Sequence, residues 1–170
     1  MEVLVLNEMI TLMQYFQSAA DMGMQWFTDG KISLSDQKEI VLQKEQKYNL
    51  LKIIFASPSI LTLQEKTDLL AKEKVRDFSD SDLLHEQGCL SANYEDAAKL
   101  AVWESYVKGS FNVKFLEASS RHFYNYLNVA QCQDFADHFF DSIESVFATH
   151  HRDYAQAFFL QLSPTFLGRE

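Results

Sequence analysis

The sequence has few of the residues that interrupt helices or build strands. Its 170 residues include only two prolines and five glycines, and valine, isoleucine and threonine together are sparse. Strands favour β-branched residues, and the turns between strands favour glycine and proline. A β-sandwich or β-barrel is therefore excluded, and an all-α chain is expected.

Cysteines and long apolar runs are also scarce. Cys89 and Cys132 are the only cysteines and lie far apart, which excludes a disulfide framework or a thiolate zinc site and favours a reducing cytoplasm. No run reaches the roughly 18 apolar residues that a membrane span needs. Polar residues interrupt the stretch Met1–Ala20 and no basic region precedes it, so we expect no signal peptide there.

The charge is predominantly negative. The chain has 15 Lys and Arg against 24 Asp and Glu, a formal net charge of −9, so its average surface repels nucleic acid and anionic membranes. Hydrophobic residues make up 47% and charged residues 23%, which is typical of a folded globular protein. The length suits one domain that spans residues 1–170.

Apolar residues recur at spacings of three and four, the period of amphipathic helices. We expect eight to ten helices in antiparallel pairs, forming an α–α superhelix of the HEAT-like type or a bundle, although no repeat period is evident. The expected segments are an N-terminal helix ending near Asp21–Gly23, a long helix from Ser35 to Ser57, Leu63–Lys74 after a Thr62/Glu65 capping box, a short helix from Asp77–Ser81 through Leu90, Asn93 to Gly109, a segment from Asn112, another through Val146, and Arg152–Leu162.

The same spacing predicts which side chains are buried. The predicted core residues are Leu6, Met9, Ile10, Met13 and Phe16; Tyr48, Leu51, Ile54 and Phe55; Tyr94, Ala97, Ala98, Ala101, Val102 and Ser105; Phe115, Leu116, Phe123, Tyr126 and Leu127; Phe135, Phe139, Ile143 and Val146; and Ala155, Phe158 and Leu162. Trp103 shares a helix with Ala97 and Ala101 and is expected to be buried between helix pairs.

Candidate metal ligands are few. Zinc peptidases use His-Glu-x-x-His because both imidazoles then emerge on one helix face. The only His-Glu step here is His85-Glu86, and Cys89 stands where the second histidine would be, so we expect a solvated helix face. His150 and His151 are adjacent and would point about 100° apart on a helix; complementing a helix end is the better interpretation.

The other candidate site residues do not form a recognised catalytic or binding motif. Asp134 and His138 form an i, i+4 pair of the kind usually found in surface electrostatics. Ser110 lacks the second glycine of a nucleophile elbow, and no glycine-rich phosphate loop is present. The aromatic residues Phe135, Phe139, Phe140 and Phe147 are expected to pack in the core. We predict no catalytic, cofactor-binding or metal-binding residue in this chain.

Six short segments nevertheless form an ordered pattern. They are Tyr48-Asn49-Leu50-Leu51, Glu65–Leu70 with Arg76-Asp77, Glu95–Trp103, His122-Phe123-Tyr124, Phe135–Phe140, and Leu162-Ser163-Pro164. In order and spacing they resemble the C-terminal helical domain, ERAP-like and HEAT-like, of aminopeptidase N-type zinc peptidases. The best segment is similar to that family's Glu-Ala-Lys-Ala-Ala-Ala-Trp helix, with Lys99 and Trp103 in register. The chain departs from the family at Phe78-Ser79, where Pro-Thr is usual, and at Phe147, where tryptophan is common.

The resemblance implies that residues 1–170 are the C-terminal part of a larger helical domain. The zinc site and catalytic domain would lie upstream in the same polypeptide, and the helical domain would cap a cleft that removes N-terminal residues from peptides. No catalytic residue can be transferred to this chain, which should be inactive and zinc-free alone. The alternative is a free-standing helical-repeat scaffold that binds a protein or peptide.

The two ends of the chain are expected to differ. The first helix has Leu4, Val5 and Leu12 beyond its predicted buried stripe, more apolar surface than a terminal helix normally carries. We therefore expect self-association through the N-terminal helices, whereas Arg152–Glu170 should be more polar and uncovered.

Overall fold

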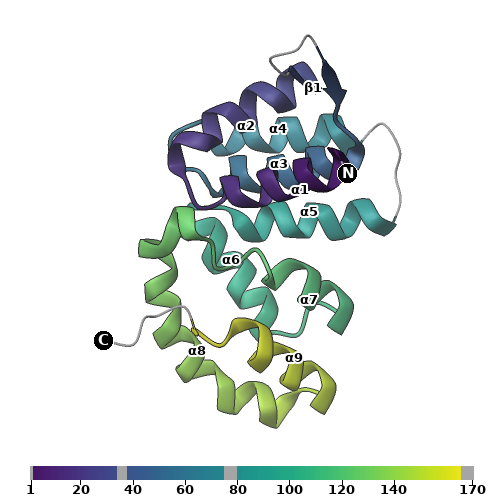
Figure 1. The fold of residues 1–170 in the computed structure, drawn as a ribbon. Coiled ribbons are helices and arrows are strands. Elements are labelled where there is room, and N and C mark those ends of the chain that lie inside the picture. The colour runs from purple at the N-terminus through teal and green to yellow at the C-terminus, as the bar shows by residue number, and fades with distance from the viewer. Residues whose placement is uncertain (1, 34–37, 75–79, 166–170) are drawn as a thin grey trace.

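The structure is a computed structural model that describes residues 2–33, 38–74 and 80–165. Within these ranges the chain is all-α, as predicted, with nine α-helices and one small antiparallel hairpin (Figure 1). The elements are α1 (Glu2–Met13), α2 (Gln17–Asp29), β1 (Lys31–Ser33), β2 (Glu39–Val41), α3 (Lys44–Ala56), α4 (Leu63–Lys74), α5 (Asp80–Ala92), α6 (Asp96–Val107), α7 (Val113–Ser120), the 3-10 turn η1 (Tyr126–Asn128), α8 (Val129–Thr149) and α9 (Arg152–Leu162).

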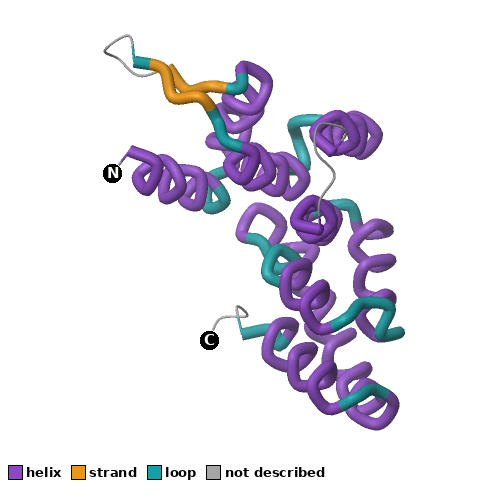
Figure 2. Tube along the Cα trace, turned by 90° about the vertical axis from the view of Figure 1, so that its right-hand side faces the viewer, coloured by secondary structure: helices purple, strands orange, loops and turns teal. Residues whose placement is uncertain are grey.

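The helices stack in sequence order along the molecule. The odd-numbered helices form a continuous layer in which α1 packs on α3, α3 on α5, α5 on α7 and α7 on α9. The even-numbered helices pack against them, with α2 and α4 on α3, α6 on α5 and α8 on α9. Helices α1 to α4 therefore lie at one end of the stack and α8 and α9 at the other, with α5 between them (Figures 1 and 2).

Three even-numbered helices share a structural repeat. Lys66, Lys99 and Cys132 are 33 residues apart, and each is the fourth residue of its helix, α4, α6 or α8. Each side chain contacts carbonyl oxygens near the end of the preceding odd-numbered helix. Lys66 Nζ donates to the carbonyls of Phe55 and Ser57 at 3.3 and 2.6 Å, and Cys132 Sγ lies 3.6 Å from the carbonyl oxygen of Phe123.

Lys99 makes the equivalent contacts at the end of α5. Its Nζ donates to the carbonyls of Ser91 and Asn93 at 3.2 and 3.3 Å and lies 4.4 Å from the centre of the Phe123 ring. The last carbonyls of a helix have no intrahelical partner, so these contacts supply the missing donors. Burial lowers the pKa of both Lys66 and Lys99 to about 8.

The equivalence of α4, α6 and α8 extends to further positions along each helix. The residues four and seven positions further on are buried too, so each helix presents the same face to the odd-numbered layer. The three sets are Lys66, Leu70 and Glu73; Lys99, Trp103 and Tyr106; and Cys132, Ala136 and Phe139. The helices α4, α6 and α8 are therefore structural repeats of one another, which supports the superhelical form of the predicted fold.

The largest apolar cluster surrounds Trp103, which is buried as predicted. The rings of Phe123, Phe135 and Phe158 lie with their centres 5.5–5.7 Å from that of Trp103. The tryptophan thus joins α6, α8, α9 and the turn after α7. The smaller clusters at the other end of the stack centre on α1 to α3 and on α3 to α5.

Several sequence predictions are confirmed. Helices α4 and α9 have the predicted bounds, and Asn112 accepts a hydrogen bond from the Phe115 amide at the start of α7. The Thr62/Glu65 capping box forms, with the Thr62 amide donating to Glu65 at 2.9 Å. The predicted core residues of α3 and α9 are buried. None of the helices in the described ranges combines the length and apolar character that crossing a membrane requires.

The predicted end of the first helix is wrong. The helix ends at Met13, and α2 runs on through Asp21 and Gly23 to Asp29. Gly23 is a packing residue and no helix stop, since a Cβ there would lie 3.3 Å from the Met13 methyl group. Phe16 lies beyond this end and is exposed, and Met9 lies off the buried face that Leu6, Ile10 and Met13 form. Both were placed in the predicted stripe.

The predicted long helix from Ser35 is also wrong in its first part. Ser35 lies outside the described residues, and β2 pairs antiparallel with β1, with Ile40 opposite Ile32, before α3 begins at Lys44. The β-branched pair Ile40-Val41 suits a strand. Gly30, with a φ of 67°, ends α2 in the left-handed conformation that favours glycine.

The buried face of α6 was predicted a fraction of a turn away from its actual place. Ala97 and Ala101 are exposed, and Lys99, Trp103 and Tyr106 are buried in their stead. The N-cap is Glu95, while Asn93 accepts a hydrogen bond from the Glu95 amide. The large aromatic residues determine the face of this helix, and the small alanines that suggested a core stripe do not.

Three further predictions need correction. Helix α5 is a full helix of 13 residues from Asp80, and Asp77 of its predicted start lies outside the described residues. Tyr126 is exposed and packs against Tyr15, with 4.5 Å between ring centres and the two rings tilted. Exposed Phe159 and Leu160 make the described part of Arg152–Glu170 less polar than expected.

Candidate functional site

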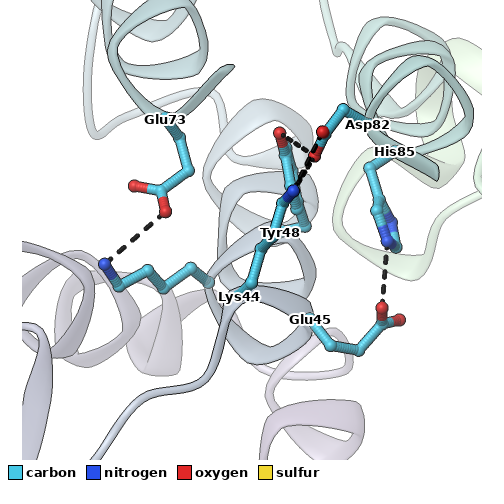
Figure 3. Close-up of polar contacts among 7 residues, drawn as sticks. Lys44, Glu45, Tyr48, Glu73, Asp82 and His85 are labelled. Carbon is cyan, nitrogen blue, oxygen red and sulfur yellow. Dashed lines mark hydrogen bonds and ion pairs between the residues drawn. The ribbon is translucent and has the colours of Figure 1, made fainter. Parts of the chain in front are cut away.

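A network of buried polar side chains joins α3 to α5 (Figure 3). Asp82, at the start of α5, is fully buried; it accepts hydrogen bonds from the Tyr48 hydroxyl and the Lys44 ammonium, both at 2.9 Å. Burial and the neighbouring Asp82 carboxylate raise the pKa of Tyr48. Lys47 on α3 reaches Glu73 on α4 at 3.5 Å, so the network ties three helices together.

His85 lies beside this network. Its ring stacks on Tyr48 with 4.6 Å between ring centres, and its Nε2 lies 2.9 Å from a carboxylate oxygen of Glu45 (Figure 3). The sequence neighbour Glu86 pairs instead with Lys74 at 2.7 Å. Cys89 is fully buried, and burial raises the pKa of its thiol to about 12. The three residues singled out by the His-Glu step therefore have separate partners and do not converge.

A pocket opens on the face of the odd-numbered layer, between α1, α3 and the end of α7. It has a volume of about 240 Å³ and an apolar floor of Ile10 and Ile53. Its main polar lining residues are Gln14, Asn49, Lys52, Arg121, His122 and Asn125. We call it the Lys52 pocket. It contains two cationic side chains and no carboxylate, in a chain whose formal net charge is −9.

The polar side chains of this pocket offer several hydrogen-bond donors. Asn49 accepts a hydrogen bond from Lys52 Nζ at 3.0 Å, and Asn125 accepts one from the Leu127 amide at 2.9 Å. Each amide oxygen thus already accepts one hydrogen bond, and the two amide NH₂ groups are further donors. Lys52 Nζ has three N–H donors and uses one on Asn49. Arg121 is exposed and adds a guanidinium at the rim.

Gly88 brings Lys52 and His122 together. A Cβ at position 88 would lie 3.1 Å from Lys52 Cε and 3.1 Å from His122 Cδ2, so a larger residue there would press on both side chains. Lys52 is only 9% exposed, and burial lowers its pKa. A second hollow shares Asn49, Lys52, Arg121 and His122, and it extends toward His85. Lys52 and Arg121 therefore line both the Lys52 pocket and this second hollow.

His122 is held in its neutral form by this setting. Burial and the positive charges of Lys52 and Arg121, together with His85, lower its pKa to about 3. In the unfolded chain a histidine titrates near 6.5. The unfolded chain therefore binds more protons than the folded chain below about pH 6.5, and folding stability falls as the pH drops toward 3.

We expect His122→Gln to remove part of this acid sensitivity. Between pH 7 and pH 5 the wild type should lose about 2 kcal/mol through His122 alone, whereas the variant should lose correspondingly less. Denaturant unfolding at a series of pH values measures the difference. His138→Gln, at an exposed position of α8, is the matched control and should keep the wild-type slope. Parallel curves for the wild type and His122→Gln would contradict the assignment.

The adjacent histidines both lie at helix ends, His150 at the carbonyl end of α6, whereas His151 caps the start of α9 as an acceptor and not as a complementary charge. His150 Nε2 lies 2.8 Å from the carbonyl oxygen of Val107, the last residue of α6, and its ring packs beside Tyr154. His151 is the N-cap of α9, where its Nδ1 accepts from the Asp153 amide at 3.4 Å. Gly109 fits beneath the His150 ring, and its positive φ of 68° ends α6.

The remaining candidates lie apart from the Lys52 pocket. Asp134 and His138 are both exposed on α8, and Ser110 is exposed in the turn after α6. Phe135 and Phe139 are buried, but Phe140 and Phe147 are exposed, so the prediction that all four pack in the core is wrong for two of them. Among residues that the structure describes, no three His, Cys, Asp or Glu side chains are grouped so as to hold a metal ion.

Lys52, Arg121 and His122 were not identified as site residues from the sequence. His122 entered only as part of a packing segment of the family resemblance, and Lys52 lies in the middle of an apolar helix. Lys52 lies in α3, whereas Arg121 and His122 lie in the turn after α7, more than sixty positions further on. No motif joins them. The sole local signal is an arginine-histidine step at the end of a helix.

Comparison with known proteins adds no identification. No family model and no curated protein matches the chain.

Proposed function

We propose that residues 1–170 form the C-terminal helical cap of an aminopeptidase N-type zinc peptidase that removes N-terminal residues from peptides. In this proposal the chain holds no catalytic or zinc-binding residue, and its partner is an upstream catalytic domain of the same polypeptide. A reducing compartment such as the cytoplasm suits its two cysteines, which are buried and free.

One observation about α6 carries the proposal. The segment most similar to the family is Glu95–Trp103, with Lys99 and Trp103 in register with the family's lysine and tryptophan. These two residues belong to the buried face of α6, with Lys99 fully buried and Trp103 3% exposed. Neighbouring Ala97 and Ala101 are exposed. The shared residues are thus the ones that position α6 in the stack, as expected for residues retained with a fold.

The free-standing repeat scaffold is the second candidate. The repeated face of α4, α6 and α8 favours it as much as it favours a cap domain, because stacked helical repeats commonly bind proteins or peptides. The two candidates differ in what covers α1. A cap domain continues into an earlier helical layer, whereas the first helix of a free-standing scaffold faces water.

The exposed surface of α1 supports the cap. Leu4, Val5 and Leu12 are 69%, 55% and 56% exposed, and Met9 is exposed beside them. Several exposed apolar side chains on one helix are typical of an interaction surface. An earlier helix pair packed on α1 would bury it.

This apolar face predicts self-association of the isolated chain. Light scattering at increasing protein concentration should detect dimers or larger species, and Leu4→Lys with Leu12→Lys should make the chain monomeric because both positions are water-exposed and tolerate charge. Leu160→Lys, on the exposed side of α9, is the control and should leave the association of the chain unchanged. A wild-type chain that stays monomeric throughout would favour the free-standing scaffold.

The cap proposal also predicts that the isolated chain neither hydrolyses aminoacyl substrates nor retains zinc after dialysis. Zinc needs three or four closely spaced ligands, and the spacing of His, Cys, Asp and Glu in this sequence provides none. Metal analysis and a fluorogenic aminoacyl substrate measure the two properties. One zinc per chain, lost together with activity on substitution of His138 or His151, would refute the proposal.

A further inference from the structure

The Lys52 pocket is lined by two cationic side chains and no carboxylate. Cationic side chains in an acidic protein usually pair with carboxylates, as Lys74 does with Glu86 and Lys108 with Glu104. The two cations of this pocket have none in its lining. Lys52, nine-tenths buried, donates a hydrogen bond to the neutral amide of Asn49. A buried cation is costly, and the Glu45 charge that acts on Lys52 comes from outside this lining. A bound anion would therefore stabilise the site.

The donors are suited to an oxygen anion. Oxyanions accept several N–H donors at once, and charge-assisted hydrogen bonds of this kind are about twice as strong as neutral ones. The pocket offers the Lys52 ammonium, the Arg121 guanidinium and the Asn49 and Asn125 amides around one volume of about 240 Å³. That volume accommodates a carboxylate or phosphate group with water.

Glu45, the carboxylate whose charge acts on Lys52, lies in the adjoining hollow and is already paired with His85. Glu45 lines the opening toward α5, where it contacts His85 Nε2 at 2.9 Å. It does not line the Lys52 pocket itself, whose charged residues are Lys52 and Arg121. The positive charge is therefore concentrated at the end between α1, α3 and α7.

We propose that the Lys52 pocket binds an oxyanion group, a carboxylate or a phosphate, through Lys52, Arg121 and the amide groups of Asn49 and Asn125. The site lies on the face of the odd-numbered helices, away from the repeated contacts of α4, α6 and α8. This inference does not depend on the aminopeptidase proposal, since it concerns groups within this chain.

Titration with sodium phosphate and, separately, with sodium acetate tests the proposal on the whole chain. Ionic strength is kept constant with sodium chloride, and binding is measured by calorimetry and by the midpoint of thermal unfolding. At ten times its dissociation constant, a bound anion should raise the midpoint by about 3–6 °C. Binding of phosphate alone or of acetate alone identifies the source of the oxyanion, and either supports the proposal.

Two variants and a matched control separate this site from general salt effects. Arg121→Gln changes an exposed side chain and should weaken binding at least tenfold, and Lys52→Met should abolish it. Lys114 is an exposed cation of α7, the helix that Arg121 follows. The Lys114→Gln variant should bind the anion as the wild type does. If the Lys52→Met variant does not fold, the anion affinity of Arg121→Gln alone tests the proposal. Absence of binding of both anions, or equal binding by wild type and Arg121→Gln, would overturn the proposal.

Discussion

Replacing Trp103 with alanine should destabilise the chain by about 3–5 kcal/mol, the range for large aromatic residues in a core. The side chain is 3% exposed and contacts Phe123, Phe135 and Phe158, which come from three different parts of the C-terminal half. Its removal opens a cavity that none of these neighbours can fill without moving a helix. Denaturant unfolding at neutral pH measures the loss.

Leu100→Ala is the control for this substitution because Leu100 lies on the exposed side of the same helix. It should change stability by less than about 0.5 kcal/mol, as surface substitutions usually do. An unchanged unfolding midpoint for Trp103→Ala would mean that the residue faces solvent and that α6 packs through another face.

Lys99→Met should lower stability by about 2–4 kcal/mol. Methionine keeps the apolar stem of the side chain, so packing around it is largely preserved. The carbonyls of Ser91 and Asn93 lose their shared donor at the end of α5, and each buried acceptor left without a donor costs about 1–3 kcal/mol. This loss exceeds the gain from removing a buried ammonium whose pKa is already lowered to about 8.

Lys114→Met, at an exposed position of α7, is the matched control and should leave the unfolding free energy nearly unchanged. Lys66→Met should behave like Lys99→Met, because Lys66 Nζ serves the carbonyls of Phe55 and Ser57 in the same way. If both buried lysines can be replaced by methionine without loss, their carbonyl contacts do not hold the helix pairs together.

Residues that begin or end helices made part of the fold predictable. The Thr62/Glu65 box, Asn112 and the proline after Leu162 placed three helix ends correctly because each depends on residues a few positions apart. The period also located the core of α3 and α9. Prediction of helix ends failed at Gly23. A glycine often ends a helix, but Gly23 lies within α2 and allows close packing with Met13.

The repeat was invisible in the sequence for a chemical reason. Its first position is lysine in α4 and α6 and cysteine in α8. A buried lysine counts as polar in any hydrophobic pattern, so Lys99 shifted the predicted face of α6 toward Ala97 and Ala101. What the three residues share is a contact with carbonyl oxygens of the preceding helix. Only the three-dimensional arrangement shows this.

The Lys52 pocket could not be predicted either. Lys52 alone looks like an isolated charge in the apolar segment from Leu50 to Phe55, and Arg121 and His122 look like a solvated helix end. Their proximity depends on the packing of α3 and α7 against α5, and on Gly88 leaving room between them. The site is formed by the packing of helices that are distant in sequence, so local sequence patterns cannot predict it.

The central claim is that this chain is the cap of a larger zinc aminopeptidase, and the natural reading frame tests it most directly. Sequencing the full-length transcript that encodes these residues, followed by expression of its complete product, gives the decisive measurement. We expect a much longer chain with His-Glu-x-x-His upstream of residue 1 and zinc-dependent release of N-terminal residues from peptides. A reading frame that opens at Met1, or a longer product without this motif and activity, would contradict the claim.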